Sequence, residues 1–158
     1  MLFEKYFRKE KRPINKAQHI LLKLKEMDLN ISYLLTNAQF ILYVAITNLS
    51  DKEQRFYFSN DTGSLARNGI HLFNIKYEKV IAYEKIFISP VPGKEQTYAD
   101  LLKPKETKRF ELQASVAAEN NQLILLFKGI SFKIPKSEKF YIAFNFLDTR
   151  SNVLEVAI

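Results

Sequence analysis

The sequence predicts an all-β fold of two packed sheets, built from about eight to ten short strands that follow a basic, helical N-terminal arm. Three observations lead to this prediction. Apolar residues alternate with polar ones in many separate runs, which is the period of a strand with one buried face. Residues that form turns separate these runs at roughly even spacing. No long helical pattern follows residue 26.

The strongest strand signal runs from Gln39 to Asp51, and we expect it to be the central strand of a sheet. One of its faces is entirely apolar, and the other is half apolar, which suits a strand with a core on one side and partial cover on the other. The apolar face carries Phe40, Leu42, Val44 and Ile46, and the second face carries Ile41, Tyr43, Ala45 and Thr47. Residues 48–51 then predict a turn.

The segments on either side of this strand are shorter. Residues 14–19 remain unassigned, and residues 20–26 read as a strand although part of their apolar spacing is also helical. Asn68-Gly69 is the best hairpin signal of the chain, because a type I′ turn needs positive φ at both central residues. The expected elements are strands at 28–35, 54–59, 64–67 and 70–77, with a loop at 60–63.

The second half repeats the pattern of alternating run and polar turn. Residues 79–89 predict a strand, or a helical turn over 78–85, and residues 98–102 predict one turn of helix closed by Pro104. In residues 107–116 the alternation is clean, so we expect one face in the core and one in water. Residues 90–97 contain two prolines and a glycine and predict a long loop. The expected strands are 107–116, 122–127, 130–134, 140–146 and 153–158.

Three short pieces resemble bacterial immunoglobulin-like sandwich domains. Tyr43–Lys52 is similar to a strand and turn of those domains, Leu102–Phe110 to their proline-containing turn, and Ser151–Leu154 to their closing strand. The chain departs from the pattern at Lys105, where a glycine is usual, and it lacks the buried Trp and Cys pair of antibody domains. The resemblance implies an immunoglobulin-like sandwich and no particular activity.

Composition limits the class of protein further. With 158 residues and 47% apolar residues, the chain is long and apolar enough for one domain with a sizeable core, filled mainly by its 13 Phe. We expect an arm at 1–19 and a sandwich domain at 20–158. Cysteine is absent, which excludes disulfides and thiolate metal sites. We see neither a signal peptide nor a spanning segment, so we expect a cytoplasmic protein.

The positive charge is concentrated in the N-terminal arm. Residues 1–25 carry eight Lys or Arg against two Glu, whereas the rest of the chain is almost neutral. Apolar residues of the arm recur at helical spacing, so we predict a helix that docks on this domain or on a partner. The predicted contact residues are Leu2, Phe3, Tyr6 and Phe7 on the apolar face, with Lys5, Arg8, Lys9 and Lys11 around them.

A search for catalytic groups finds none that stands out. His19 and His71 are the only histidines, and no carboxylate cluster flanks either of them. The sequence also lacks a Gly-x-Ser-x-Gly elbow and a glycine-rich phosphate loop. We therefore expect no enzymatic activity, no metal and no cofactor.

Three functions remain open. The first is a protein-binding module, an adaptor, inhibitor or assembly subunit that docks a partner or copies of itself through the sandwich and the arm. The second is a carbohydrate-binding module, for which Tyr57, Tyr98 and Tyr141 are the candidate exposed aromatic platforms. The third is binding of nucleic acid or an anionic membrane surface through the basic arm.

Overall fold

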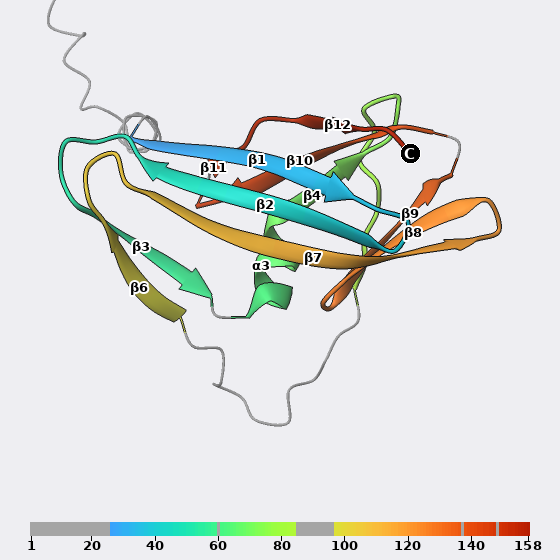
Figure 1. The fold of residues 1–158 in the computed structure, drawn as a ribbon, viewed down its shortest axis with the longest axis horizontal. Helices are drawn as coiled ribbons and strands as arrows, with labels where there is room; N and C mark the ends of the chain where they lie inside the picture. Colours follow the sequence, from blue (N-terminus) through green and yellow to red (C-terminus); the bar gives the residue numbers. More distant parts are fainter. Residues whose placement is uncertain (1–25, 60, 85–96, 137, 148) are drawn as a thin grey trace, which may run out of the picture.

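The structure is a computed structural model that describes residues 26–59, 61–84, 97–136, 138–147 and 149–158. It confirms the predicted all-β sandwich, which consists of antiparallel sheets packed face to face (Figure 1). The arm at 1–19, the uncertain segment at 20–25 and most of the predicted loop at 90–97 lie outside the described residues.

The first sheet forms the front of Figure 1 and has six strands in the order β1-β2-β7-β8-β9-β5. Neighbouring strands are antiparallel throughout. The strands are β1 (Met27–Leu35), β2 (Gln39–Asn48), β7 (Thr107–Glu119), β8 (Gln122–Phe127), β9 (Ile130–Pro135) and β5 (Tyr83–Glu84). β2 lies between β1 and β7, as expected of a central strand.

The second sheet lies behind the first and is organised around β10 (Phe140–Phe146). β4 (Ile70–Phe73), β12 (Leu154–Val156) and β11 (Thr149–Arg150) all pair with it. A separate two-stranded ribbon joins β3 (Gln54–Ser59) to β6 (Thr97–Leu102). The single described helix, α3 (Thr62–Gly69), leads from β3 to β4.

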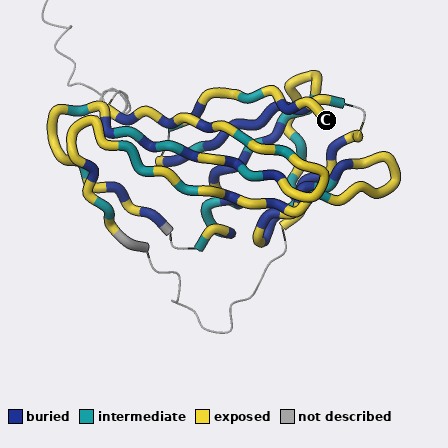
Figure 2. Tube along the Cα trace, viewed as in Figure 1, coloured by how far each residue is buried: buried dark blue, intermediate teal, exposed yellow. Residues whose placement is uncertain are grey.

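The core lies between the two sheets and is largely aromatic. The predicted inner face of β2 is confirmed, because Phe40, Leu42, Val44 and Ile46 are almost completely buried. Phe40 approaches Phe140 of the second sheet with ring centroids 6.4 Å apart. Figure 2 shows the resulting alternation of buried and exposed residues along the front strands. Burial of this kind contributes roughly 25 cal/mol per Å² of apolar surface.

Residues with positive φ, in the left-handed region, lie in three of the turns. Asn120 and Asn121 (φ 50° and 61°) join β7 to β8, and Gly129 (φ 78°) lies between β8 and β9. Lys105 also has positive φ, at 64°, in the turn that precedes β7. Glycine adopts this conformation most readily, so Lys105 holds it against the ordinary preference of a residue with a side chain.

The predicted hairpin at Asn68-Gly69 is wrong, because residues 62–69 form α3 and not a strand and turn. Asp61 caps this helix, with Oδ1 accepting a hydrogen bond from the Gly63 N–H at 3.0 Å. Gly69 is required for packing and not for positive φ. A Cβ atom at Gly69 would lie 2.2 Å from the Phe144 ring, so only glycine lets the helix approach β10 this closely.

Two further predictions are corrected. Residues 98–102 are part of β6 and not a helical turn, because they pair along their length with β3. Within the described part of 79–89, only Tyr83–Glu84 is a strand and no helical turn forms at 78–84, where Lys79 instead bridges to Phe73. Pairing with distant strands decides the conformation of both segments.

The two faces of β2 can be tested with a matched pair of substitutions. Val44→Asp should destabilise the fold by several kcal/mol, because it places an unpaired carboxylate where the side chain is 1% exposed. Tyr43→Ser, on the 36% exposed side, should cost clearly less. Urea midpoints that are equal for the two variants, or reversed, would contradict this assignment.

The close approach at Gly69 gives a second prediction. Gly69→Ala should lower the free energy of unfolding by about 1–3 kcal/mol, since the added methyl group overlaps the Phe144 ring. Asn68→Ala is the matched control, because Asn68 is exposed on the same helix and alanine favours a helix. Thermal melts in which both variants behave like the unchanged chain would show that α3 does not pack on β10 as described.

Candidate functional site

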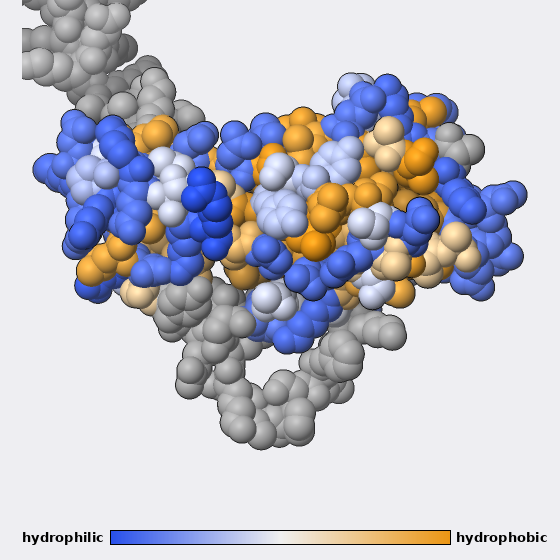
Figure 3. Space-filling view, in the orientation of Figure 1, coloured by the Kyte–Doolittle hydropathy of each residue, from blue (hydrophilic) through white to orange (hydrophobic). Residues whose placement is uncertain are grey.

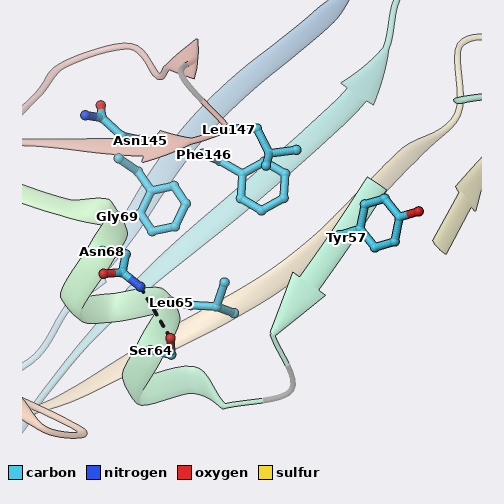
Figure 4. A pocket seen from close by; sticks show the side chains of 9 residues that line it. Tyr57, Ser64, Leu65, Asn68, Gly69, Asn145, Phe146 and Leu147 are labelled. Atoms are coloured by element: carbon cyan, nitrogen blue, oxygen red, sulfur yellow. Dashed lines mark hydrogen bonds between the residues drawn. The ribbon is translucent and has the colours of Figure 1, made fainter. Parts of the chain in front are cut away.

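A cleft of about 410 Å³ opens between α3, β3 and the end of β10, and we regard it as the candidate binding site (Figure 4). It forms because α3 and β3 stand on either side of the strand that carries Phe144 and Phe146. The described residues that line it are Tyr57, Ser64, Leu65, Asn68, Gly69, Phe144, Asn145, Phe146 and Leu147.

The floor of the cleft is apolar and tightly packed. Phe144 is fully buried and Phe146 is 8% exposed. The Phe146 ring stacks on Phe58 of β3 with centroids 5.1 Å apart, which ties the ribbon to the second sheet. Leu65 of α3 is partly buried against the same cluster. Preformed apolar surface of this kind is typical of binding sites.

Two large apolar side chains on the rim remain exposed. Tyr57 points outward from β3 and is 57% exposed, and Leu147 after β10 is 52% exposed. Leu147 has a φ of 45°, in the left-handed region that favours glycine or asparagine. This conformation costs about 1–3 kcal/mol for an ordinary residue. The fold thus keeps an exposed leucine at a position where a polar residue would fit the backbone better.

Polar groups lie along the helix side of the cleft. The Asn68 amide donates to Ser64 Oγ at 3.3 Å, one helical turn away, as drawn in Figure 4. Among the described lining residues none carries a carboxylate, an amine, a guanidinium or an imidazole. Ser64 therefore has no carboxylate or imidazole beside it among the described lining residues, and the polar groups of this set are hydroxyls and amides that can hydrogen-bond a ligand.

Charges at the start of α3 hold the helix in place. Asp61 receives a hydrogen bond from Lys128 Nζ at 2.9 Å, and Arg67 lies 3.8 Å from the same carboxylate. The hydrogen bond from Lys128 lowers the pKa of Asp61, while partial burial acts in the opposite direction. The N-cap and these cations fix the position of the wall that carries Ser64, Leu65 and Asn68.

Asn145 links the cleft to a histidine on the outer face of the second sheet. Its Nδ2 lies 3.1 Å from His71 Nε2, so the neutral imidazole can accept a hydrogen bond from the amide. Its Oδ1 is buried and has no hydrogen-bond partner within the described structure. Burial lowers the pKa of His71, and the positive charges of Lys79 and Arg150 add to the effect.

A second hollow, of about 540 Å³, lies on the outer face of the first sheet. Arg109 and Glu111 are among its described lining residues together with Tyr43, so it carries charged groups that the described lining of the cleft lacks. Figure 3 shows hydrophobic surface across the middle of this face, between hydrophilic ends. Leu34 and Tyr43 contribute to this face as exposed residues. We prefer the cleft, because its rim combines an exposed aromatic residue with a conformationally costly leucine.

The structure shows the side-chain position of only some of the predicted site residues. Tyr57 lies on the rim of the cleft, as an exposed platform requires. Tyr98 is in β6 and the position of its side chain is not described. Tyr141 is buried, against expectation, because Tyr77 stacks on it at 4.5 Å. The predicted contact residues of the arm, Leu2 to Lys11, lie outside the described residues.

Other residues of the cleft were not predicted. The local sequence held one signal for α3, the capping Asp61 before an apolar pair at Leu65 and Ala66. Leu147 carries no such signal, because only the three-dimensional pairing of β10 with β11 shows that it is held at positive φ.

The described residues contain no group of three or more His, Cys, Asp or Glu side chains that could hold a metal ion. Over the same residues, no helix has the length and apolar character needed to cross a membrane.

Comparisons with known proteins add little. No known protein family matches the chain, and no curated protein matches it. Among solved structures, the chain is similar to a beta-glucosidase from Kluyveromyces marxianus in complex with glucose, with 13% identity and a TM-score of 0.37. The match covers 82% of this chain but 14% of the enzyme chain. A likeness this weak carries no argument about function.

The lowered pKa of His71 predicts how the free energy of unfolding depends on pH. The unfolded chain takes up a proton at the ordinary histidine pKa of about 6.5, whereas the folded chain resists protonation. The contribution of His71 to stability should therefore be complete above this pH and be lost as the pH falls below it. His71→Gln should flatten the change in unfolding free energy between about pH 7.5 and 5.5. A dependence of unfolding free energy on pH that is unaltered in His71→Gln would contradict the assignment.

Proposed function

We propose that this chain is a non-catalytic protein-binding module that receives an apolar side chain of its partner in the cleft between α3 and β3. The observation that carries the proposal is the rim, where Tyr57 and Leu147 are more than half exposed and Leu147 is held in an unfavourable backbone conformation. Exposed aromatic and aliphatic residues around a preformed apolar floor are the usual anchors of a protein interface.

The chemistry of the cleft also favours binding over catalysis. The described lining residues supply an apolar floor from Phe144 and Phe146, and hydroxyl and amide groups from Ser64 and Asn68. Such groups can hold a side chain and the adjoining peptide groups of a partner, whereas proton transfer needs a positioned acid or base. The functional part of the domain is then the cleft, and the sandwich is its rigid support.

The conformation of Leu147 allows the proposal to be tested without damage to the fold. Leu147→Asn removes the exposed apolar side chain and supplies a residue that tolerates positive φ. It should raise the melting temperature by about 2–4 °C and yet reduce capture of the partner from native extract. Tyr57→Ser should reduce the same capture with little effect on stability, since Tyr57 is exposed.

Leu34→Asn is the matched control, because Leu34 is 48% exposed on β1 and lies outside the cleft. Its capture profile, read by quantitative mass spectrometry, should equal that of the unchanged chain. If the proteins captured by Leu147→Asn and Tyr57→Ser are also unchanged, the cleft is not the binding site.

Carbohydrate binding is the second candidate, and the position of Tyr57 favours it. An exposed tyrosine ring near hydroxyl and amide groups is the arrangement that stacks on a sugar and hydrogen-bonds its hydroxyls. A glycan array separates the two functions. Binding of a neutral oligosaccharide that is lost in Tyr57→Ser and kept in Leu34→Asn would favour the second candidate.

A further inference from the structure

The outer face of the first sheet, seen in Figure 3, carries a hollow directly beside an exposed aromatic ring. The hollow has a volume of about 540 Å³, and Ala45 of β2 has the smallest side chain among its described lining residues. Tyr43 lies two residues earlier in the same strand, so its side chain points to the same face, where it is 36% exposed. The small residue and the large one are thus roughly 7 Å apart along the strand.

Two opposite charges repeat this spacing on the neighbouring strand, β7. Arg109 pairs with Ala45 across the sheet, and Glu111 pairs with Tyr43. Both charged side chains are exposed, and within the described residues neither of them forms an ion pair. The Glu111 carboxylate accepts a hydrogen bond from the Gln113 amide at 3.2 Å. The hollow and the guanidinium therefore form one row across the sheet, and the ring and the carboxylate form the next row.

These two rows are complementary to each other in both shape and charge. A two-fold axis that runs across the strands, between the rows, places each row opposite the other row of a second copy. Tyr43 of each copy then enters the hollow over Ala45 of the other copy. Arg109 of each copy meets Glu111 of the other copy. One symmetry operation satisfies both contacts, because the two pairs of residues are in register across β2 and β7.

We infer that the outer face of the first sheet joins two copies of this chain into a symmetric dimer, with each Tyr43 in the hollow over Ala45 of the other copy. Sheets that pack face to face cross at about 30° and interdigitate their side chains, so this contact has the ordinary form of sheet packing. Four strands about 4.8 Å apart and about seven residues long cover roughly 450 Å² per copy, which is the size of a transient interface. We therefore expect the dimer to form at micromolar or higher concentration.

The arrangement of charges favours a second copy over other occupants. A partner that carries one sign of charge is attracted by either Arg109 or Glu111 and repelled by the other, which lies two residues away. A second copy supplies both charges and the aromatic ring in the order that the face requires. The hollow shares no described lining residue with the cleft, so this interface is distinct from the site proposed above for another protein.

Charge reversal tests the inference by sedimentation velocity of the full chain, over concentrations from about 5 to 500 μM, the range of transient complexes. The unchanged chain should shift from monomer to dimer as its concentration rises. Arg109→Glu and Glu111→Arg should each weaken self-association by about tenfold or more, because like charges then face each other twice. An equimolar mixture of the two variants should form the dimer again, since the two acidic side chains of one variant face two basic side chains of the other.

Two further variants separate this contact from a general effect of charge or of misfolding. Lys136→Glu changes the net charge as Arg109→Glu does, but Lys136 is exposed outside the hollow, so its dimer should equal that of the unchanged chain. Ala45→Phe fills the hollow and should abolish the dimer, whereas its thermal melt should stay close to that of the unchanged chain because Ala45 lies on the outer face.

Three results would overturn the inference. The first is a chain that stays monomeric at every concentration, including the case in which Ala45→Phe removes another protein captured from native extract. The second is a dimer that survives both charge reversals or Ala45→Phe. The third is loss of the dimer in both reversal variants without its recovery in their mixture. None of these results bears on the cleft, because Tyr57→Ser and Leu147→Asn test that site separately.

Discussion

The arrangement of the domain depends on Asn48, a fully buried asparagine at the end of β2. Its Oδ1 accepts hydrogen bonds from Ser50 N–H at 3.0 Å and Ser50 Oγ at 2.7 Å. The two N–H groups of its amide are shared among three carbonyl oxygens, at 2.8, 2.9 and 3.2 Å from Nδ2, which are those of Lys52, Leu102 and Lys103. Its backbone N–H and C=O are also bonded, to Glu106 and Lys105. Loss of this side chain would leave several polar groups without partners, each at a cost of about 1–3 kcal/mol.

These bonds join parts of the chain that are far apart in sequence. Asn48 connects the end of β2 to the turn before β3 and to the end of β6, so it holds the ribbon against the first sheet. Lys108 supports the same junction, since it pairs with Asp100 of β6 and lies 4.5 Å from the centre of the Phe58 ring. The ribbon held in this way places Tyr57 of β3 across the cleft from α3. The cleft is therefore a consequence of where the ribbon is fixed.

Much of the fold could be predicted from the sequence, because strands with one buried face show their period directly. The alternation in β2 and β7 identified the residues that face the core, and the polar turn at 48–51 marked the end of β2. The cleft was harder to predict. Asn68-Gly69 has the local preference of a hairpin, but contact with Phe144, 75 residues further on from Gly69, requires a glycine there for another reason. The strand at 98–102 likewise depends on pairing with β3. Such long-range contacts leave no period in a single sequence.

Native-state hydrogen exchange of Asn48→Ala tests most directly whether this asparagine positions the ribbon that builds the cleft. We expect amides of β3 and β6 to lose protection by a much larger factor than the paired residues Leu42 and Leu112 of β2 and β7. The ribbon should open as a separate unit while the sandwich remains folded. Equal loss of protection in the ribbon and in the central strands, or no loss in either, would show that Asn48 does not position the ribbon.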